Sequence, residues 1–451
     1  MPTWTIGGTL MRLYQQVWTD VKQWDRNIKL FFIANLCFQV GGGMFMVLYN
    51  LYIQSLGYND DMNGTLISLQ SLATALMFVP IGFLGDRTSR KKVLILGALL
   101  TGVGFIGRAY VESVMSLNML AIFSGLVASA FQVIAVPFLA ENAQKEQRLQ
   151  LFSYHFALGL AAQVLGSMGG GALADMLQSV GWSKVASLQT VLMLGGTATL
   201  AAFLPLLAVK EVRKQDVPRI EIEAEDMNSA QAAASVATSA QAGTSPMPRP
   251  AAEWRDIRRL TFCQLLVGLG SGLVVPYLNL YFTNRFNASI TAVGFLISLG
   301  QIMTIISMLI GPTLVKRIGQ VPAIVVFQML SLPFLLLTGF TNAISIAIVS
   351  FLFRQALMNA ANPIQSAVMV DRISDSRRGI ANSLTQTAFM LGWASMGTVQ
   401  SYLVTTYGYY WGYAITFSIT GVLYVTSSIC YFTMFREKRI PKGLQAEGVT
   451  T

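Results

Sequence analysis

Apolar stretches of about 20 residues alternate with short polar connections along most of the chain. A helix rises about 1.5 Å per residue, so a stretch of this length crosses the hydrocarbon core of a bilayer. The pattern predicts twelve spanning helices, near 28–54, 64–84, 92–110, 117–139, 150–173, 187–208, 259–283, 290–315, 320–340, 343–368, 380–403 and 411–434. The predicted fold class is an all-α polytopic membrane protein.

Polar segments divide the twelve spans into two sets of six. The expected organisation is an N-terminal segment at 1–27, a six-helix bundle at 28–208, a linker at 209–254, a second six-helix bundle at 255–435 and a tail at 436–451. The linker passes through an acidic run and ends in Ala, Ser, Gln and Thr, a composition that buries too little apolar surface to fold. We therefore expect a flexible linker.

The N-terminal segment places Leu10, Tyr14 and Val17 at helical spacing, which predicts a short amphipathic helix lying on the membrane interface. A plain solvated tail is the alternative. Charged residues such as Arg12 and Asp20 interrupt its apolar residues, so we expect no cleavable signal peptide.

The two halves repeat each other. The matched segments are 50–52 with 279–281, 84–89 with 314–319, and Glu141, Arg148 and Ser153 with Asp371, Arg378 and Ser383, at offsets of 229 or 230 residues. A parallel repeat of this kind implies a pseudo-twofold axis along the membrane normal, with a binding site between the two halves.

Composition agrees with a membrane protein. Hydrophobic residues make up 53% of the chain and charged residues 12%, with a mean hydropathy of +0.55, whereas soluble domains carry about 25% charged residues. The net charge is +10, yet among the 31 Lys and Arg only Arg108, Lys184, Arg285 and Arg354 lie outside the termini and alternate connections. This asymmetry predicts cytoplasmic termini and argues against nucleic acid as a partner.

A charged turn separates the second and third spans, reading Gly82-Phe83-Leu84-Gly85-Asp86-Arg87-Thr88-Ser89-Arg90-Lys91-Lys92. This many charged side chains cannot lie in the hydrocarbon core of a bilayer. The turn therefore predicts a helical hairpin whose tip lies at a membrane surface. Together with the six-plus-six spans and the central linker, this motif resembles the major facilitator superfamily (MFS) over about 28–434. The resemblance implies the MFS fold, alternating access of the rocker-switch type and no enzymatic activity.

The resemblance also implies a cytoplasmic gate. Asp86 would face the helix N-terminus near Gly379 and Ile380, and Arg90 would lie near Glu141. The gate candidates are Gly82, Asp86, Arg87, Arg90, Glu141, Arg317, Gly319 and Asp371. Two departures from the family pattern are Ser89, where a glycine is usual, and Lys316, which replaces the aspartate of the second copy. A topology signal without a gating role is the alternative.

The fifth span partly resembles the family's antiporter signature, because Gly159, Gly166 and Gly170 keep its spacing. Gly171 stands where the signature has a proline. The match slightly favours export by antiport, although small residues for close helix packing explain the same glycines.

Ionisable residues are scarce inside the spans, and no Asp or Glu lies near a predicted midplane. Arg354, inside the tenth span, is the strongest candidate for binding an anionic or strongly hydrogen-bonding substrate. His155 in the fifth span is the candidate for proton coupling, since an unperturbed histidine titrates near pH 6.5. Arg108 lies four residues from Glu112, which predicts a structural ion pair.

Neutral amides on cavity-lining spans complete the expected binding site. With Arg354, the substrate-cavity candidates are Asn50, Gln132, Gln163, Asn279, Gln301, Asn359 and Gln386. Hydrogen bonds between helices are the alternative role for each amide. Cys37, Cys263 and Cys430 lie in apolar segments without metal-ligand spacing, so no metal and no cofactor are expected.

These observations predict a monomeric secondary transporter for a small organic solute in the cytoplasmic membrane, with a slight preference for proton-coupled efflux of an amphiphilic compound. The partners are then the solute, the lipid bilayer and a coupling proton. Uptake of a polar metabolite such as a sugar, by uniport or symport, is the alternative. A non-transporting membrane scaffold or sensor on the same fold is a more remote one.

Overall fold

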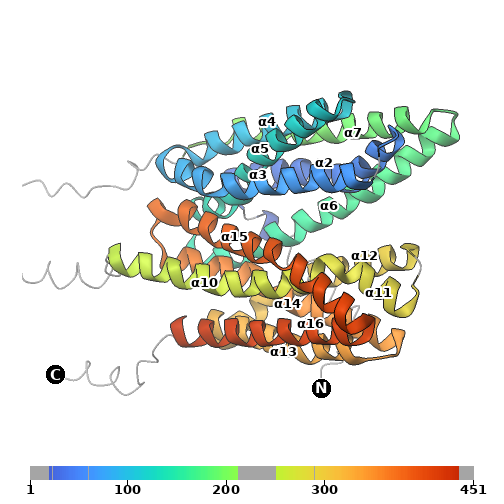
Figure 1. Cartoon of the computed structure of the whole chain (residues 1–451). Helices are drawn as coiled ribbons and strands as arrows, with labels where there is room; N and C mark the ends of the chain where they lie inside the picture. The colour runs from blue at the N-terminus through green and yellow to red at the C-terminus, as the bar shows by residue number, and fades with distance from the viewer. Residues whose placement is uncertain (1–19, 23, 59, 212–249, 289, 436–451) are drawn as a thin grey trace, which may run out of the picture. The chain divides into compact units, whose positions relative to one another are not determined.

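A computed structural model describes residues 20–22, 24–58, 60–211, 250–288 and 290–435, and these residues are almost entirely helical (Figure 1). The main helices are α2 (Arg26–Ser55), α3 (Asp60–Arg87), α4 (Arg90–Tyr110), α5 (Val114–Glu141), α6 (Arg148–Ser179), α7 (Lys184–Ala201), α8 (Phe203–Leu207), α10 (Pro250–Val274), α11 (Leu278–Phe286), α12 (Ile290–Ile318), α13 (Gln320–Phe340), α14 (Ile344–Arg372), α15 (Arg378–Ser395) and α16 (Gly397–Phe435). Short 3₁₀ turns are η1 (Lys145–Gln147), η2 (Val275–Tyr277) and η3 (Asp375–Arg377).

Within the described residues, 11 helical stretches are long and apolar enough to cross a membrane. The last of them, Asp375–Phe435, is 61 residues long and has room for two crossings. Its backbone turns at Gly408, where φ is 75° and the helix is interrupted. Gly408 lies between the predicted end of the eleventh span and the predicted start of the twelfth. The predicted all-α, twelve-span fold class is therefore confirmed.

Prolines inside the predicted spans have two different effects. Pro276 lies in η2, where α10 gives way to α11, so the seventh span is broken. Pro137 and Pro363 lie inside the continuous helices α5 and α14. Membrane helices tolerate such prolines because neighbouring groups satisfy the freed backbone carbonyls.

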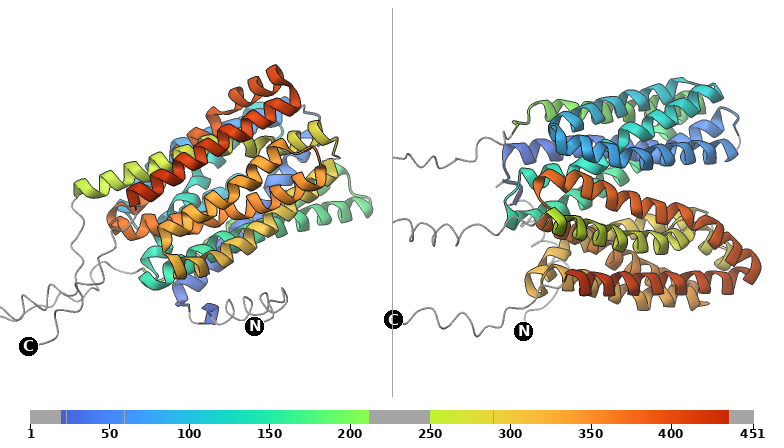
Figure 2. Two further views of the ribbon diagram at one scale, coloured as in Figure 1. Left: turned by 90° about the horizontal axis from the view of Figure 1, so that it is seen from below. Right: turned by 60° about the vertical axis from the view of Figure 1, so that its left-hand side comes forward.

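The chain forms two compact units, which we describe separately. Unit 1 comprises residues 1–145, 173–258 and 369–383. In unit 1, α3 packs against α5, and α7 packs against both α2 and α4 (Figures 1 and 2). The buried side chains between these helices are mostly apolar and aromatic, including Phe45, Phe105 and Tyr52. Phe45 and Phe105 stack with ring centroids 4.0 Å apart.

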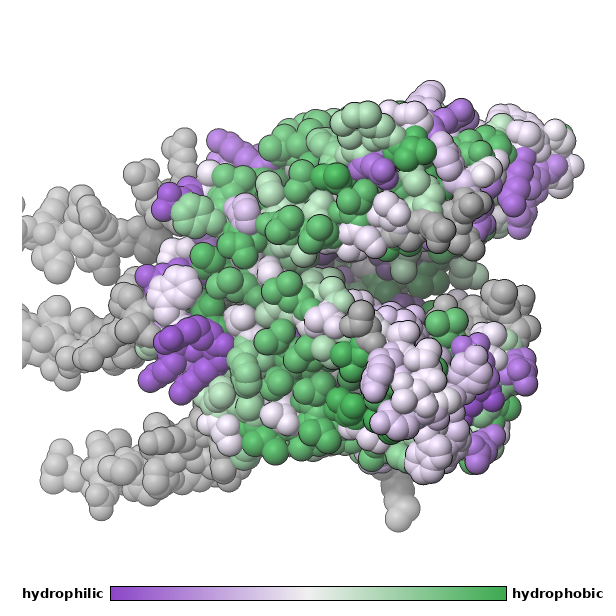
Figure 3. Space-filling view, in the orientation of Figure 1, coloured by the Kyte–Doolittle hydropathy of each residue, from purple (hydrophilic) through white to green (hydrophobic). Residues whose placement is uncertain are grey.

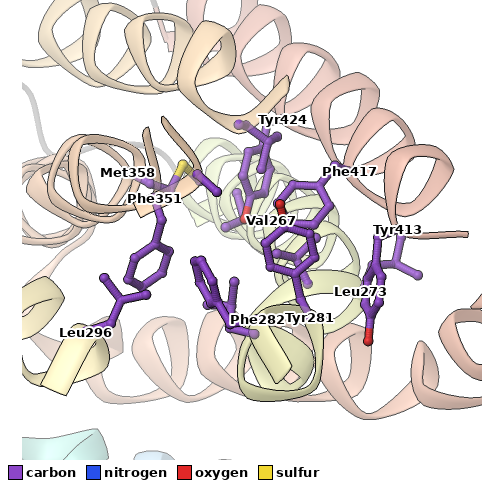
Figure 4. Close-up of a cluster of buried hydrophobic side chains, with 14 residues drawn as sticks. Val267, Leu273, Tyr281, Phe282, Leu296, Phe351, Met358, Tyr413, Phe417 and Tyr424 are labelled. Atoms are coloured by element: carbon purple, nitrogen blue, oxygen red, sulfur yellow. The ribbon is translucent and has the colours of Figure 1, made fainter. Parts of the chain in front are cut away.

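Unit 2 comprises residues 146–172, 259–368 and 384–451. Helix α13 packs along α16, and α11 contacts both α12 and α16. Its core is rich in aromatic rings, as Figure 4 shows for Tyr281, Phe282, Phe351, Phe417 and Tyr424. The Tyr281 ring meets Tyr413 edge-on at 5.2 Å between centroids, a preferred geometry for aromatic pairs.

The internal repeat is visible in matching contacts of the two units. In unit 1, the hydroxyl of Tyr52 donates to the carbonyl of Ala109 at 2.9 Å. In unit 2, the hydroxyl of Tyr281 donates to the carbonyl of Thr338. Both donor and acceptor are shifted by 229 residues, the offset at which the two tyrosines align in the sequence. The repeat thus fixes the same helix-to-helix contact twice.

Hydrophobic side chains cover the flanks of the helices on the face drawn in Figure 3, and hydrophilic residues gather toward the helix ends. Exposed apolar residues such as Leu76, Phe295 and Val422 are each 66–70% exposed. A water-exposed surface of this kind would be costly, whereas lipid tails cover it favourably.

Several predicted segments fall outside the described residues. Most of the N-terminal amphipathic segment (1–19 and 23), most of the linker (212–249) and the tail (436–451) belong to this group. Their predicted roles stay predictions, as do the boundaries of the two six-helix bundles.

Candidate functional site

A charge cluster in unit 1 surrounds the turn between α3 and α4. Both oxygens of the Asp86 carboxylate accept hydrogen bonds from the start of α15, from Gly379 N and Ile380 N, each at 2.8 Å. Its Oδ1 also accepts from Arg90 Nη2 at 3.3 Å. These are the contacts that the family resemblance implied. A carboxylate at a helix N-terminus satisfies free N–H groups and complements the helix dipole.

Arg90 holds three carboxylates together. Its Nη1 lies 3.2 Å from Glu141 Oε2 and 2.8 Å from Asp375 Oδ1. The second cation, Arg378, lies 2.8 Å from the same Asp375 oxygen. The Arg90 side chain is only 4% exposed, and buried charges are stable only when they are paired in this way. The cluster therefore ties the α3–α4 turn to α5 and to the start of α15.

Glycine permits the close approach that this cluster requires. A Cβ atom on Gly82 would lie 2.5 Å from the Gly379 carbonyl oxygen and 2.5 Å from Ser383 Oγ. No side chain fits at that distance, so α3 and α15 pack backbone to backbone here. Among the other gate candidates of unit 1, Arg87 is exposed and its guanidinium lies over the Phe83 ring at 3.9 Å.

The second-copy gate candidates have a different setting. Arg317 is exposed at the end of α12 in unit 2, and Gly319 caps α13 with φ 90°. Asp371 is exposed near the end of α14, in the part that belongs to unit 1. Positive φ explains the glycine at 319. Whether any of these residues gates transport stays a prediction.

A cavity of about 270 Å³ lies within unit 2. It is bordered by α6, α10, η2, α14, α15 and α16. The lining residues are Phe156, Gln264, Val267, Ser271, Val275, Arg354, Gln355, Met358, Asn359, Asn362, Gln365, Ser366, Gln386, Phe389, Trp393 and Tyr424. Three predicted substrate residues, Arg354, Asn359 and Gln386, share this cavity. Figure 4 shows three further lining residues, Val267, Met358 and Tyr424, within the aromatic core.

Arg354 is the only charged side chain of the cavity lining and is 3% exposed. Its Nη2 donates to the Tyr424 hydroxyl at 3.0 Å, and that hydroxyl lies 2.9 Å from Ser271 Oγ. Its Nη1 donates to Gln355 Oε1 at 3.2 Å, while its buried Nε has no hydrogen-bond partner among the described residues. A guanidinium carries five N–H donors, so neutral groups satisfy only part of this one.

Amides of α10 and α14 form two hydrogen-bonded pairs in the polar wall. Gln264 Nε2 donates to Gln365 Oε1 at 3.1 Å, and Asn362 Nδ2 donates to Asn359 Oδ1 at 3.3 Å. Each pair leaves further donors and acceptors unused, because a side-chain amide has two N–H groups and two acceptor positions. The wall can therefore bind hydroxyl, amide or carbonyl groups of a solute.

Aromatic and apolar side chains, among them Phe389 and Trp393, line the same cavity. The two rings lie 5.8 Å apart between centroids. Phe156 of α6 also lines it, and the ring of the neighbouring His155 lies 5.3 Å from the Phe156 ring. His155 itself is buried and is not a lining residue. Its coupling role stays a prediction.

The remaining substrate candidates do not line this cavity. Gln163 and Gln301 belong to unit 2 and are half-buried, whereas Asn50 and Gln132 belong to unit 1. Asn279 lies in α11, but its side chain is outside the described part of the structure.

Sequence reasoning missed Gln264, Ser271 and Tyr424 as members of the site. A signal for the α14 wall was present, because Gln355, Asn359, Asn362 and Ser366 recur at helical spacing on one face. Tyr424 has no such signal, since a tyrosine in an apolar helix is ordinary core. Only packing shows that its hydroxyl reaches Arg354.

Arg108 contacts other groups than the predicted ion-pair partner Glu112. Its Nη1 donates to Gln70 Oε1 at 2.7 Å, and its guanidinium lies 3.9 Å from the centroid of the Tyr49 ring. The side chain is buried in unit 1, so the ring and the amide take the place of a carboxylate.

Comparison with known families agrees with the twelve-span fold. The model of the Major Facilitator Superfamily matches twice, at residues 31–261 and 260–449. Among curated relatives, an uncharacterized MFS-type transporter of Methanocaldococcus jannaschii is 24% identical over 155 residues, 34% of this chain and 39% of that protein. The multidrug resistance protein MdtG of Escherichia coli O9:H4 is 26% identical over 148 residues, 32% of this chain and 36% of that protein. The chain thus spans well under half the length of these relatives.

Solved structures show a similar fold over nearly the whole chain. A bacterial homologue of the iron transporter ferroportin in an outward-facing state superposes with a TM-score of 0.70 at 14% identity, covering 91% of this chain and 99% of that one. The Escherichia coli fucose:proton symporter FucP has a TM-score of 0.67 at 13% identity, covering 89% and 98%. At such identities the likeness shows the fold alone.

Proposed function

Because the chain belongs to the Major Facilitator Superfamily, we propose that it is a secondary transporter that moves a small organic solute across the cell membrane by alternating access. The observation that carries this proposal is the cavity of unit 2, which combines one buried cation, several amides and aromatic rings in about 270 Å³. Sites for small molecules likewise combine apolar and aromatic walls with convergent polar groups that fix the orientation of the ligand.

Export of an amphiphilic compound is the preferred direction. The likeness to proteins named for multidrug resistance supports it, together with the partial antiporter signature of α6. In this reading both termini are cytoplasmic, the protein acts as a monomer, and a proton antiported through His155 supplies the driving force.

Uptake of a polar metabolite is the second candidate, because the α14 wall is rich in amides and the lining contains no carboxylate. Sugars bind to amides of this kind through their hydroxyl groups.

The test is solute transport into inverted membrane vesicles that contain the protein. Accumulation that requires an imposed pH gradient, and that nigericin abolishes, supports proton-coupled export. Accumulation that is indifferent to nigericin refutes the proton coupling. Movement only in right-side-out vesicles refutes export and supports uptake.

A further inference from the structure

Unit 2 places one positive charge in its cavity without a protein counter-charge. Its segments contain three acidic residues, Glu146, Glu437 and Glu447. Glu146 is exposed in the turn before α6, and the other two lie outside the described residues. Residues 257–370 and 376–436 contain no Asp or Glu at all. The described unit 2 segments of the helices that form the cavity therefore offer Arg354 no carboxylate.

The neighbours of Arg354 are arranged to present it rather than to neutralise it. Tyr424 and Gln355 each accept one of its hydrogen bonds, and Ser271 lies 2.9 Å from the Tyr424 hydroxyl. All four residues line the cavity. Removing an unpaired charge from water is expensive, and a cation inside a membrane segment is usually retained for a function.

From this geometry we infer that the transported solute is an organic anion, and that its carboxylate, sulfonate or phosphate group binds at Arg354, Tyr424 and Ser271. This inference rests on the transport function proposed above. An anion supplies the missing counter-charge and accepts hydrogen bonds from the remaining N–H groups of the guanidinium. Carboxylate and phosphate groups bind a guanidinium through two parallel hydrogen bonds. One of the two hydroxyls donates to the same group, because the hydrogen bond between Tyr424 and Ser271 uses the proton of the other.

The other walls define the remainder of the solute. Phe389 and Trp393 offer rings that pack on a flat apolar body, and the amide pairs of α10 and α14 bind its neutral polar groups. The cavity volume of about 270 Å³ is just below the usual range of drug-sized pockets. The solute is thus a small amphiphilic anion.

An anionic solute also supplies a driving force without a protonatable carboxylate. A monoanionic solute carries a net charge of −1 across the membrane. At equilibrium, an inside-negative potential of 100 mV then makes the outside concentration of the anion about 50-fold higher than the inside concentration. The membrane potential therefore adds to the proton gradient as a driving force for export of an anion.

The experiment uses the full-length protein in proteoliposomes and three ring-matched probes: benzenesulfonate, benzenesulfonamide and benzyltrimethylammonium, with phenyl phosphate and benzoate as further anions. Binding is measured by thermal shift and movement by solute flux. We expect the anions to bind and move at least tenfold better than the neutral and cationic probes. An outward flux of anion should rise with an inside-negative potential set by potassium and valinomycin.

Arg354→Gln keeps hydrogen-bonding capacity and removes the charge, so it should abolish the tenfold preference for anions. Arg108→Gln is the matched control, because Arg108 is equally buried but is hydrogen-bonded to Gln70 in unit 1, and it should keep the preference. Tyr424→Phe should weaken anion binding several-fold without loss of the folded protein, judged by monodisperse elution.

The outcomes separate the two levels of inference. Equal or better handling of the neutral or cationic probe by the parent protein, or an unchanged preference in Arg354→Gln, overturns the anion assignment and leaves transport intact. If no probe of any charge binds or moves, the proposed transport function fails and the anion assignment fails with it.

Discussion

The carboxylate of Asp86 accepts two backbone hydrogen bonds from the start of α15, and we predict that this contact holds one conformation of the transport cycle. We predict that Asp86→Asn weakens this contact strongly. The carboxylate side chain is 7% exposed and accepts from Gly379 N and Ile380 N, each at 2.8 Å. Asparagine has one acceptor oxygen, so one of the two N–H groups would face an NH₂ group instead.

The magnitude follows from the interactions lost. A buried N–H without an acceptor costs about 1–3 kcal/mol, and a missing negative charge at a helix N-terminus costs about 0.3–1 kcal/mol. Arg90 keeps Glu141 and Asp375 as partners, so little is added from its side. The sum of about 1.3–4 kcal/mol corresponds to a rise of about 10- to 900-fold in the population of the separated state.

Cysteine accessibility measures this population. Ser383 is fully buried beside Gly82, so Ser383→Cys in a protein without Cys37, Cys263 and Cys430 should react with a thiol reagent only when α3 and α15 separate. When opening and closing are fast, the labelling rate tracks the open population. Asp86→Asn should therefore speed labelling about 10- to 900-fold by the same free-energy sum.

Glu141→Gln is the comparison variant for this measurement. Glu141 is 24% exposed and is one of three carboxylates around Arg90, so its neutralisation should change the rate by about threefold or less, as expected for a partly exposed ion pair. A labelling rate in Asp86→Asn within a factor of two of the parent would show that Asp86 does not hold the contact, and that the charged turn serves topology alone.

Three further predictions concern stability and are checked by thermal unfolding of the purified protein. Gly41→Ala should destabilise unit 1 by about 1–3 kcal/mol or more, because the added Cβ would lie 2.1 Å from an atom of α7. Gly42→Ala is the control, since nothing lies within 4 Å of a Cβ on Gly42. Equal melting temperatures of the two variants would contradict the close packing at Gly41. Tyr52→Phe should cost about 1 kcal/mol by loss of the buried bond to Ala109, and an unchanged melting temperature would show that this bond is energetically neutral. Glu253→Gln removes a carboxylate that is 4% exposed and accepts hydrogen bonds from the η3 turn at 2.9 and 3.1 Å. We expect a loss of about 1–3 kcal/mol of folding stability and faster amide hydrogen exchange in η3. Unaltered exchange would refute the anchoring role of Glu253.

Much of the architecture was predictable because a bilayer imposes strong rules. Each span needs about 20 apolar residues and must satisfy its own backbone, so span number and helical class follow from composition along the chain. The charged turn at 82–92 and the 229-residue offset of Tyr52 and Tyr281 were readable for the same reason. The hydrogen bonds of these two tyrosines to Ala109 and Thr338 show that the sequence repeat preserves the same helix-to-helix contact in both units.

The site was only partly predictable. Arg354 stood out because an arginine inside an apolar span is rare and costly, and Asn359 and Gln386 followed from their type. Asn50, Gln132, Gln163 and Gln301 have the same chemistry, yet they do not line the cavity. An amide gives no sign in the sequence of the direction in which it points.

The sequence by itself determined the class of the protein, the positions of its helices and the absence of any acidic residue from 257 to 370, since these depend on composition and order alone. Tertiary structure decided which polar residues meet. Only packing brings Tyr424 and Ser271 to Arg354, gives Arg108 a ring and an amide in place of Glu112, and breaks the seventh span at Pro276 but not the helices at Pro137 and Pro363. The physical reason is that side-chain partners depend on the rotation and approach of helices distant in sequence, which apolar periodicity constrains only loosely.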